Sequence, residues 1–215
     1  MKVLITLGPT QEPIDSVRYI TNASSGKMGV ALAEEAIRRG YEVTLISGPV
    51  NIRLPKNSKI FKVRTAKDMI STTLNELQNN YDLLISTAAI ADYTPVKIKD
   101  KKIKSGKEIL GIELVPTKKL TKEVRKNFPY LFIVAFKAEY DLTEKELIER
   151  ARSKLREEHL NLVVANDLKK NGFGSDTTEV IVINKKGDRF HLSRDTKGDI
   201  AKGIWRIVDK EKLEG

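Results

Sequence analysis

Cysteine is absent from this chain of 215 residues, and histidine occurs only as His159 and His191. Without cysteine, disulfides, thiolate catalysis and cysteine-based zinc sites are excluded. The two histidines lie far apart in the sequence, and neither has a partner at metal-ligand spacing, so a surface or core role is favoured for both. The usual serine elbow of a Ser-His-Asp triad is also missing.

Long apolar runs are lacking as well. No segment approaches the roughly 18 apolar residues that a membrane-spanning helix needs. The first residues, Met1–Gly8, have the length of a core strand and lack the cleavage region of a signal peptide. These features predict a cytoplasmic protein without a membrane partner, and the length fits a single domain over residues 1–215.

Charge of the two signs is unbalanced: 39 lysines and arginines stand against 29 aspartates and glutamates, for a net charge of +10. Three interpretations follow: nucleic-acid binding, an enzyme for polyanionic small substrates, or the Lys/Glu-rich surface of a heat-adapted protein. The basic residues are dispersed, apart from a concentration at Lys97–Lys107, and the few aromatics do not interleave with it. This distribution disfavours nucleic acid as a partner.

Apolar periodicity alternates between strand and helix patterns along most of the chain. Met28, Leu32 and Ala36 fall on one face at helical spacing, and Gly40 stands where a helix C-terminal cap belongs. The expected strands are Val3–Leu7, Glu42–Ser47, Ile60–Val63, Asp82–Thr87, Leu131–Phe136 and Asn161–Ala165, and the expected helices are Gly26–Arg39, Ala66–Leu77, Thr117–Asn127 and Thr143–Glu158. The alternation predicts an α/β fold, a Rossmann-like and mainly parallel sheet with helices on both faces.

Three further segments complete this expectation. The β-rich runs Thr178–Asn184 and Arg189–Ser193 flank a Lys-Lys-Gly-Asp turn, which predicts an antiparallel hairpin at the C-terminal edge of the sheet. A last helix is expected over about Asp195–Lys212. The lysine-rich segment at about 94–114 has weak periodicity and predicts a protruding arm, either a long loop or a two-stranded one.

The stretch Asp15–Gly29 is the most informative part of the sequence. It lies between a strand and a helix, where the free N–H groups of the first helical turn and the helix dipole favour an anion. The Gly-x-Gly-x-x-Gly spacing of dinucleotide loops and the Walker A pattern are both absent. Arg18, Asn22 and Lys27 indicate a phosphorylated or carboxylated substrate; the alternative is that Ser24-Ser25-Gly26 only caps the helix.

Small and polar residues follow the other strands too. Ser86–Tyr93 comes after a buried strand, where alanines allow a ligand to approach the backbone and Asp92 offers a carboxylate to a cation or a base amine. Phe136 ends another strand and either stacks on a base or belongs to the core. Asn166-Asp167 indicates a turn first and a ligand contact second. The lysines at 101–104 form either a solvated charge run or the means to neutralise a triphosphate.

Together these stretches resemble the phosphopantothenoylcysteine synthetase family, the ligase of coenzyme A biosynthesis. The longest match is Arg-Tyr-Ile-Thr-Asn-x-Ser-Ser-Gly-Lys-Met-Gly at 18–29, and shorter matches follow in the order of the family along nearly the whole chain. The shorter matches are Gly8-Pro9-Thr10, Ala88–Tyr93, Lys102-Ile103-Lys104, Phe136–Glu139 and Ala165-Asn166-Asp167.

The resemblance implies a ligase that joins 4'-phosphopantothenate to L-cysteine. In that family the substrate carboxylate attacks the α-phosphate of a nucleoside triphosphate. Pyrophosphate is released, and an acyl-nucleotide forms. The cysteine amine then displaces the nucleoside monophosphate. Bacterial-type members use CTP and animal members prefer ATP, with Mg²⁺ or Mn²⁺ as the implied ion. The resemblance also implies a homodimer whose arms reach across, and a fused or partner flavin-dependent decarboxylase.

Residue roles follow from the same resemblance. Arg18 and Asn22 are expected at the substrate carboxylate and its acyl form, with the Asn22 amide donating to a developing oxyanion, and Lys102 is the arm lysine that forms the intermediate. The other expected nucleotide- and substrate-side residues are Ser86, Thr87, Ala88, Ala89, Asp92, Phe136 and Lys154. Among them Ala89 contacts the substrate, and Asp92 is the expected metal ligand together with the triphosphate.

Two positions depart from the family pattern. Bacterial members commonly carry a second basic residue four after Lys154, where this chain has Glu158. CTP is the nucleotide that the resemblance implies, through an acyl-cytidylate, and this departure keeps ATP as the alternative. The usual Gly-Phe-Ala-Ala-Glu-Thr is Ala-Phe-Lys-Ala-Glu-Tyr at 135–140, so Lys137 is a candidate for the missing charge. The alternatives to a ligase are a Rossmann-like NAD(P)- or flavin-associated oxidoreductase, which the missing glycine spacing disfavours, and a basic RNA-binding module.

Overall fold

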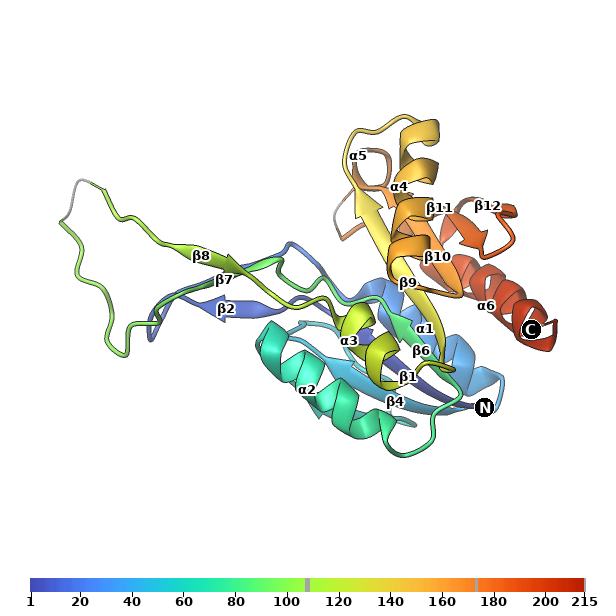
Figure 1. Ribbon diagram of the computed structural model, residues 1–215, viewed down its shortest axis with the longest axis horizontal. Helices are drawn as coiled ribbons and strands as arrows, with labels where there is room; N and C mark the ends of the chain where they lie inside the picture. Colours follow the sequence, from blue (N-terminus) through green and yellow to red (C-terminus); the bar gives the residue numbers. More distant parts are fainter. Residues whose placement is uncertain (107–108, 173, 215) are drawn as a thin grey trace.

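One mixed β-sheet forms the core of the part of the chain that the computed structural model describes, residues 1–106, 109–172 and 174–214 (Figure 1). Its strands are β1 (Lys2–Leu7), β4 (Glu42–Ser47), β5 (Lys59–Lys62), β6 (Leu83–Ser86), β9 (Phe132–Glu139), β10 (Leu162–Asp167), β11 (Thr177–Asn184) and β12 (Arg189–Thr196). Their order is β12-β11-β10-β9-β6-β1-β4-β5. Neighbours from β10 to β5 run parallel, whereas β11 and β12 are antiparallel. The predicted α/β class and antiparallel edge are confirmed.

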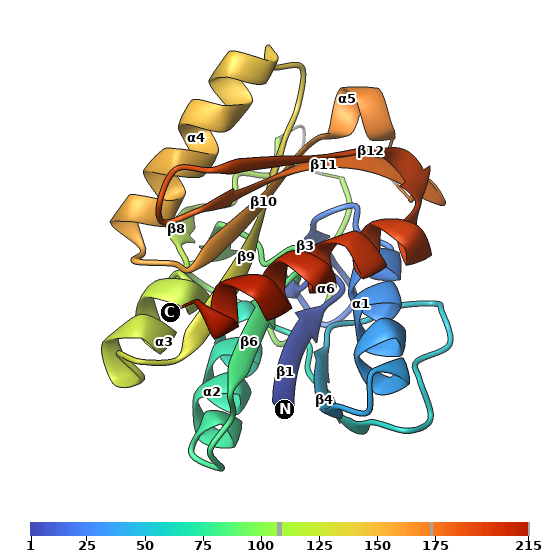
Figure 2. The ribbon, with the colours of Figure 1, turned by 90° about the vertical axis from the view of Figure 1, so that its right-hand side faces the viewer.

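Helices cover both faces of the sheet. They are α1 (Lys27–Arg38), α2 (Ala66–Leu77), α3 (Leu120–Asn127), α4 (Glu144–Glu157), α5 (Leu168–Asn171) and α6 (Lys197–Leu213). Figure 2 shows α1 and α6 side by side on one face, and α2, α3 and α4 pack on the other. Because side chains alternate along a strand, the neighbours Leu4 and Ile5 of β1 belong to the two opposite cores.

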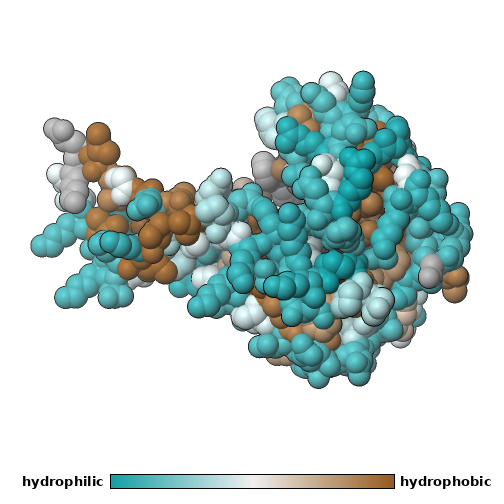
Figure 3. Space-filling model, in the orientation of Figure 1, coloured by the Kyte–Doolittle hydropathy of each residue, from teal (hydrophilic) through white to brown (hydrophobic). Residues whose placement is uncertain are grey.

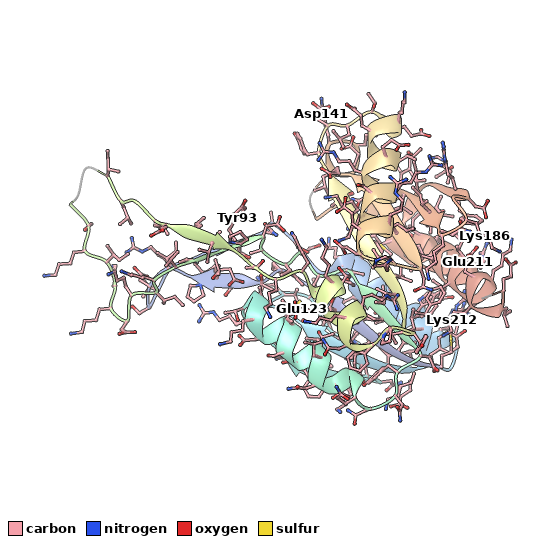
Figure 4. All side chains as sticks on the ribbon, viewed as in Figure 1. Tyr93, Glu123, Asp141, Lys186, Glu211 and Lys212 are labelled. Carbon is pink, nitrogen blue, oxygen red and sulfur yellow. The ribbon has the colours of Figure 1, made fainter. Side chains whose placement is uncertain are left out.

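Helix α6 is fixed over the sheet at several points along its length. The fully buried Trp205 donates its indole N–H to the carbonyl of Leu32 at 2.9 Å. Near the C-terminus, the Lys212 ammonium donates to the carbonyl of Asp82 at 2.9 Å (Figure 4). These contacts hold the first residue of α6, Lys197, at the carboxyl edge of the strands, where the site described below lies.

Two glycines of the 15–29 stretch set α1 close against the sheet. Gly26 precedes the helix with φ of 75°, a backbone conformation that favours glycine. A Cβ on Gly29 would stand 2.4 Å from Cβ of Leu7, so only glycine allows the first turn to approach β1 this closely. Gly26 has no side chain to cap the helix, but the hydroxyl of Ser25 accepts from the N–H of Lys27, the first residue of α1, at 3.4 Å.

The segment 94–114 leaves the body as an arm (Figure 1). At its base β7 (Tyr93–Pro95) pairs antiparallel with β8 (Leu114–Pro116), and the hairpin of β2 (Gln11–Pro13) and β3 (Tyr19–Thr21) lies beside β7. Figure 4 labels Tyr93 where the arm begins. Lys107, the end of the basic stretch noted in the sequence, lies outside the described residues. Figure 3 shows apolar side chains gathered on the arm, and the exposed ones include Val96, Ile98, Ile109, Leu110, Ile112 and Leu114.

Element boundaries near the carboxyl edge differ from the sequence-based expectation. Helix α3 begins at Leu120 and not at Thr117, because the Thr117 hydroxyl donates to the carbonyl of Ala91 at 2.6 Å and ties this residue to the end of β6. Strands β9 and β10 pair through Glu139 and Asp167, so Asn166 and Asp167 still belong to a strand. The expected turn chemistry follows directly, because the Asp167 carboxylate accepts from the N–H of Lys169 at 2.9 Å and caps α5.

Candidate active site

The connections of the sheet change direction between β1 and β6. From β1 the chain continues to β4 and β5 on one side, and β6 is added later on the other side. At such a switch point the carboxyl ends of the two strands leave a crevice between them. A cavity of about 480 Å³ lies there, and its walls come largely from residues 22–29, 86–92, 117–121 and 135–138. Lys154 of α4, Asn166 of β10 and Lys197 of α6 also line it.

Most of the candidate residues from the sequence meet at this cavity. Those that line it are Asn22, Ser86, Thr87, Ala88, Ala89, Asp92, Phe136 and Lys154. Phe136 also packs against the core on the α1 and α6 side, so the two interpretations of this residue are compatible. Among the described residues, Arg18 and Lys102 do not line the cavity; both lie on the side of the arm.

Asn22 lies at the mouth of the cavity in a defined orientation. Its amide nitrogen donates to the carbonyls of Ala89 and Ile90, at 3.3 and 3.2 Å. Only the NH₂ group of an amide donates, so two carbonyl acceptors fix the orientation of the side chain and direct its oxygen away from them. The donor role expected for Asn22 is therefore not available in this arrangement: both amide hydrogens are in use, and the side chain offers an acceptor.

The backbone of Ala89 is engaged within the protein. Its N–H donates to the carbonyl of Gly8 at 2.9 Å, and its carbonyl accepts from the N–H of Thr10 at 3.3 Å as well as from Asn22. These bonds join the ends of β1 and β6 and thereby build the floor of the crevice. What Ala89 offers to a ligand is its small side chain, which leaves room for close approach.

Ammonium groups surround the cavity. The Lys27 ammonium contacts Asp176 at 2.7 Å and the carbonyl of Gly174 at 2.9 Å. The Lys197 ammonium donates to the carbonyl of Ser175, and burial, followed by the nearby charge of Lys27, lowers its pKa. These two cations and the N-terminus of α1 make this end of the cavity suited to an anion.

The opposite end of the cavity carries paired charges. Asp92 accepts from the Lys119 ammonium. Lys154 donates to both carboxylate oxygens of Glu158, at 2.9 and 2.8 Å. Glu158 is 6% exposed and also accepts from the hydroxyl of Thr121, so it lies behind the two residues that line the wall. The Glu158 carboxylate is thus bound from within the protein and does not itself line the cavity.

The root of the arm is held by a buried carboxylate. Asp15 accepts from the Arg18 guanidinium, at 3.0 Å to Nε, and from the N–H of Ile103, also at 3.0 Å. Arg18 in turn donates to the carbonyl of Ile103 at 2.9 Å. Both backbone groups of the residue next to Lys102 are thus bound, and Arg18 already has a carboxylate partner.

Replacing Asp15 by Asn should loosen the arm. The Arg18 guanidinium first, and the Ile103 N–H second, hold the pKa of the Asp15 carboxyl well below its usual range. We expect the protection of the Ile103 amide against hydrogen exchange to fall roughly tenfold or more, because charge-assisted bonds are lost. In the native protein this protection should be full above the ordinary carboxyl pKa near 3.9 and be lost only as the pH falls toward the lowered value. Asp100→Asn, an exposed change on the same segment, is the matched control; equal protection in both variants contradicts the role of Asp15.

Metal-ligating side chains do not form a dedicated cage in the described residues: none of them makes a group of three or more His, Cys, Asp or Glu that could hold an ion. Among the helices of the described residues, none combines the length and the apolar character that crossing a membrane requires.

The model of a protein family described as the DNA/pantothenate metabolism flavoprotein C-terminal domain matches residues 1–211. The chain belongs to this family. The bifunctional coenzyme A biosynthesis protein CoaBC of Thermococcus kodakarensis is 42% identical over 210 residues, which make up 97% of this chain and 51% of that protein. CoaBC of Bacillus subtilis is 41% identical over 202 residues, 93% of this chain and 48% of that protein. The chain spans about half the length of these relatives.

Solved structures of the DNA/pantothenate metabolism flavoprotein family share this fold. The C-terminal domain of CoaBC matches with a TM-score of 0.84 at 34% identity, over 100% of this chain and 96% of that one. The DNA/pantothenate metabolism flavoprotein from Streptococcus pneumoniae matches with a TM-score of 0.87 at 30% identity, over 98% of this chain and 99% of that one.

The polar residues of the cavity that sequence reasoning missed include Lys119, Thr121 and Lys197. Lys119 and Thr121 reach the cavity because α3 starts late, and Lys197 because α6 returns across the sheet. The position of Lys197 depends on a connection that begins beyond the sheet edge, and no local pattern signals it.

Proposed function

We propose that the chain is a phosphopantothenate–cysteine ligase of coenzyme A biosynthesis, active in the cytoplasm. It joins 4'-phosphopantothenate to L-cysteine through an acyl-nucleotide. The proposal is supported by family membership, by relatives that are coenzyme A biosynthesis proteins, and by a cavity at the switch point with an anion-binding end. The observation that carries it is the fixed Asn22 amide at the mouth of that cavity.

The first step activates the carboxylate of 4'-phosphopantothenate, which is a poor electrophile. A carboxylate oxygen of 4'-phosphopantothenate forms a bond to the α-phosphorus of the nucleotide while the bond to pyrophosphate breaks. Negative groups must approach each other, so cations have to offset their charge. Lys27 and Lys197 at the α1 end serve this purpose in the chain itself, and Lys102 supplies a further ammonium from an arm.

The second step transfers the acyl group. The cysteine nitrogen bonds to the acyl carbon, the carbon–oxygen bond to the nucleotide breaks, and the nitrogen gives up a proton. An attacking amine carries N–H groups, which the oxygen of Asn22 is placed to accept. Asn22 therefore orients the nucleophile in this proposal, and two backbone carbonyls hold the amide in place for it.

A magnesium ion fits the Asp92 side of the cavity. Mg²⁺ is usually held by one or two carboxylates plus substrate phosphates rather than by a protein cage. Asp92 is exposed at the cavity wall, and its partner is the exposed side chain of Lys119. Mg²⁺, or Mn²⁺, bound by Asp92 and the triphosphate would offset phosphate charge. CTP is the proposed nucleotide, with ATP as the alternative.

A homodimer is part of the proposal. Lys102 and Arg18 lie away from the cavity of their own chain, and the arm exposes a run of apolar side chains, with Ile109 83% exposed. A second copy that receives the arm would cover these side chains and bring Lys102 to a cavity. A flavin-dependent decarboxylase, fused or separate, is the further proposed partner because the chain spans half of its CoaBC relatives.

Pyrophosphate release tests the proposal. We expect release with CTP or ATP only when 4'-phosphopantothenate is present, and formation of the amide product only when L-cysteine is added. Substrate-independent release, or none with either nucleotide, contradicts a ligase. Tight NADPH binding without 4'-phosphopantothenate would instead support the oxidoreductase alternative.

A further inference from the structure

The buried carboxylate of Glu158 organises one wall of the cavity. It binds the Lys154 ammonium through both oxygens, at 2.9 and 2.8 Å, and the Thr121 hydroxyl through Oε2. Lys154 comes from α4 and Thr121 from α3, so one carboxylate joins two helices at the point where both face the cavity. Since Thr121 is 4% exposed and Glu158 6% exposed, water does not compete effectively for these bonds.

The hydrogen-bond inventory of this cluster determines what the wall can offer. A lysine ammonium has three N–H groups, and two of those of Lys154 are used on Glu158. One donor is left. The Thr121 hydroxyl has a single hydrogen, which goes to Glu158, so only the lone pairs of its oxygen remain. Both groups line the cavity, and they present one donor beside one acceptor.

This wall is suited to an uncharged polar group. Both Lys154 and Lys27 have a carboxylate partner, but Glu158 is buried, with 7% of its side chain exposed, whereas Asp176 is 87% exposed and its charge is screened by water. The buried carboxylate beside Lys154 would repel a phosphate placed against this wall. The anion-binding features, Lys27, Lys197 and the N-terminus of α1, come from other elements that line the cavity. A nucleoside triphosphate with its base against Thr121 and Lys154 therefore extends its phosphates past Asp92, the proposed ligand of Mg²⁺, toward α1.

We propose that Glu158 is a specificity-determining positioning residue that makes Thr121 and Lys154 select a nucleobase whose Watson–Crick edge places a ring-nitrogen acceptor beside the amino group at C4 of cytosine or C6 of adenine. The inference rests on the proposed nucleotide-dependent ligation. The free donor of Lys154 matches the ring nitrogen acceptor of cytosine or adenine, and the oxygen of Thr121 accepts from the neighbouring amino group. At the corresponding positions of the Watson–Crick edge, uracil (N3 and O4) and guanine (N1 and O6) present the reverse pattern, a ring N–H beside a carbonyl oxygen, so donor would meet donor and acceptor would meet acceptor.

Nucleotide binding to the intact chain tests this inference without relying on catalysis. The dissociation constants of CTP, ATP, UTP and GTP are measured by calorimetry with Mg²⁺ present. We expect CTP and ATP to bind at least about tenfold more tightly than UTP and GTP, the scale of one matched pair of hydrogen bonds to a base. Equal binding of all four nucleotides overturns the inference.

Variants separate Glu158 from its surroundings. In Glu158→Gln the carboxylate charge is lost and the ammonium of Lys154 is released, so the preference should fall roughly tenfold, toward equal binding. Glu157→Gln, on the exposed side of the same turn, should keep it. Thr121→Val removes the acceptor oxygen and should weaken the binding of CTP and ATP alone, whereas Thr121→Ser keeps the hydroxyl and should retain their binding. These two variants test the inference even where Glu158→Gln does not fold. An unchanged preference in folded Glu158→Gln contradicts the role of Glu158.

The same measurements separate this inference from the proposed function. Selective binding of CTP and ATP without any pyrophosphate release supports the base-selecting wall and contradicts the ligase. Ligation that proceeds equally well with all four nucleotides supports the ligase and overturns the base-selecting wall.

Discussion

Lys102→Gln should abolish acyl-nucleotide formation while the protein remains folded. Lys102 is exposed on the arm, and the contacts that anchor this segment are made by the backbone of its neighbour Ile103. The substitution therefore removes an ammonium without disturbing the anchor. Loss of one group that stabilises a developing charge costs about 10²- to 10³-fold in rate. Pyrophosphate release in a single turnover measures the effect.

A neighbouring lysine supplies the control for that substitution. Lys101→Gln removes the same charge from the exposed position next to it and should retain most of the activity. If both variants lose activity equally, the arm acts through its overall charge and Lys102 has no specific role. If neither loses activity, the ammonium that meets the triphosphate comes from elsewhere in the cavity, with Lys27 and Lys197 as the remaining candidates.

Because Lys102 lies away from the cavity of its own chain, mixing two variants tests its role more strictly. Lys102→Gln chains and Asn22→Asp chains should complement each other when mixed and allowed to exchange subunits. In a mixed dimer, the intact arm of one chain serves the intact Asn22 of the other, and random pairing leaves roughly one quarter of all sites complete. Mixing that restores nothing, in a sample shown to contain mixed dimers, means that each arm serves its own chain.

The sheet and most of the cavity wall follow from local sequence patterns. Runs such as Val3–Leu7 and Glu42–Ser47 are apolar throughout because both faces of the sheet are covered, and helical spacing then determines which side of α1 is buried. Once the strands are parallel, their carboxyl ends meet at one edge. Residues that follow different strands, such as Ala88 and Phe136, are therefore predicted to lie together, as they do.

What the sequence could not provide is the long-range pairing among those residues. The contact of Glu158 with Lys154 is local, four residues along the end of α4, but the bond of Glu158 to Thr121 forms only once α3 and α4 pack together. Likewise, Arg18 pairs locally with Asp15, whereas the bonds of both residues to Ile103 exist because the arm returns past the β2–β3 loop. The bonds to Thr121 and Ile103 join segments tens of residues apart, and local patterns carry no signal for them.

Asn22→Asp should allow the acyl-nucleotide to form but slow its reaction with cysteine by about 10²- to 10³-fold, the cost of losing a preorganised polar group. The amide nitrogen of Asn22 faces the carbonyls of Ala89 and Ile90, and an aspartate carboxylate in its place would meet two acceptors with no hydrogen to donate. The side chain would turn away and lose its position for the attacking amine.

Rapid quenching and detection of the acyl-nucleotide measure this effect. The intermediate should accumulate in Asn22→Asp at cysteine concentrations that leave none in the unaltered protein. Asn166→Asp introduces the same charge at another wall of the same cavity and is the matched control. If both variants accumulate the intermediate, added negative charge is the cause. If Asn22→Asp fails to form the intermediate at all, Asn22 acts in the first step and the orientation of its amide does not serve the amine. Normal turnover would remove the residue from the mechanism, because the two hydrogen bonds that hold the amide would then serve only to join β3 to the end of β6.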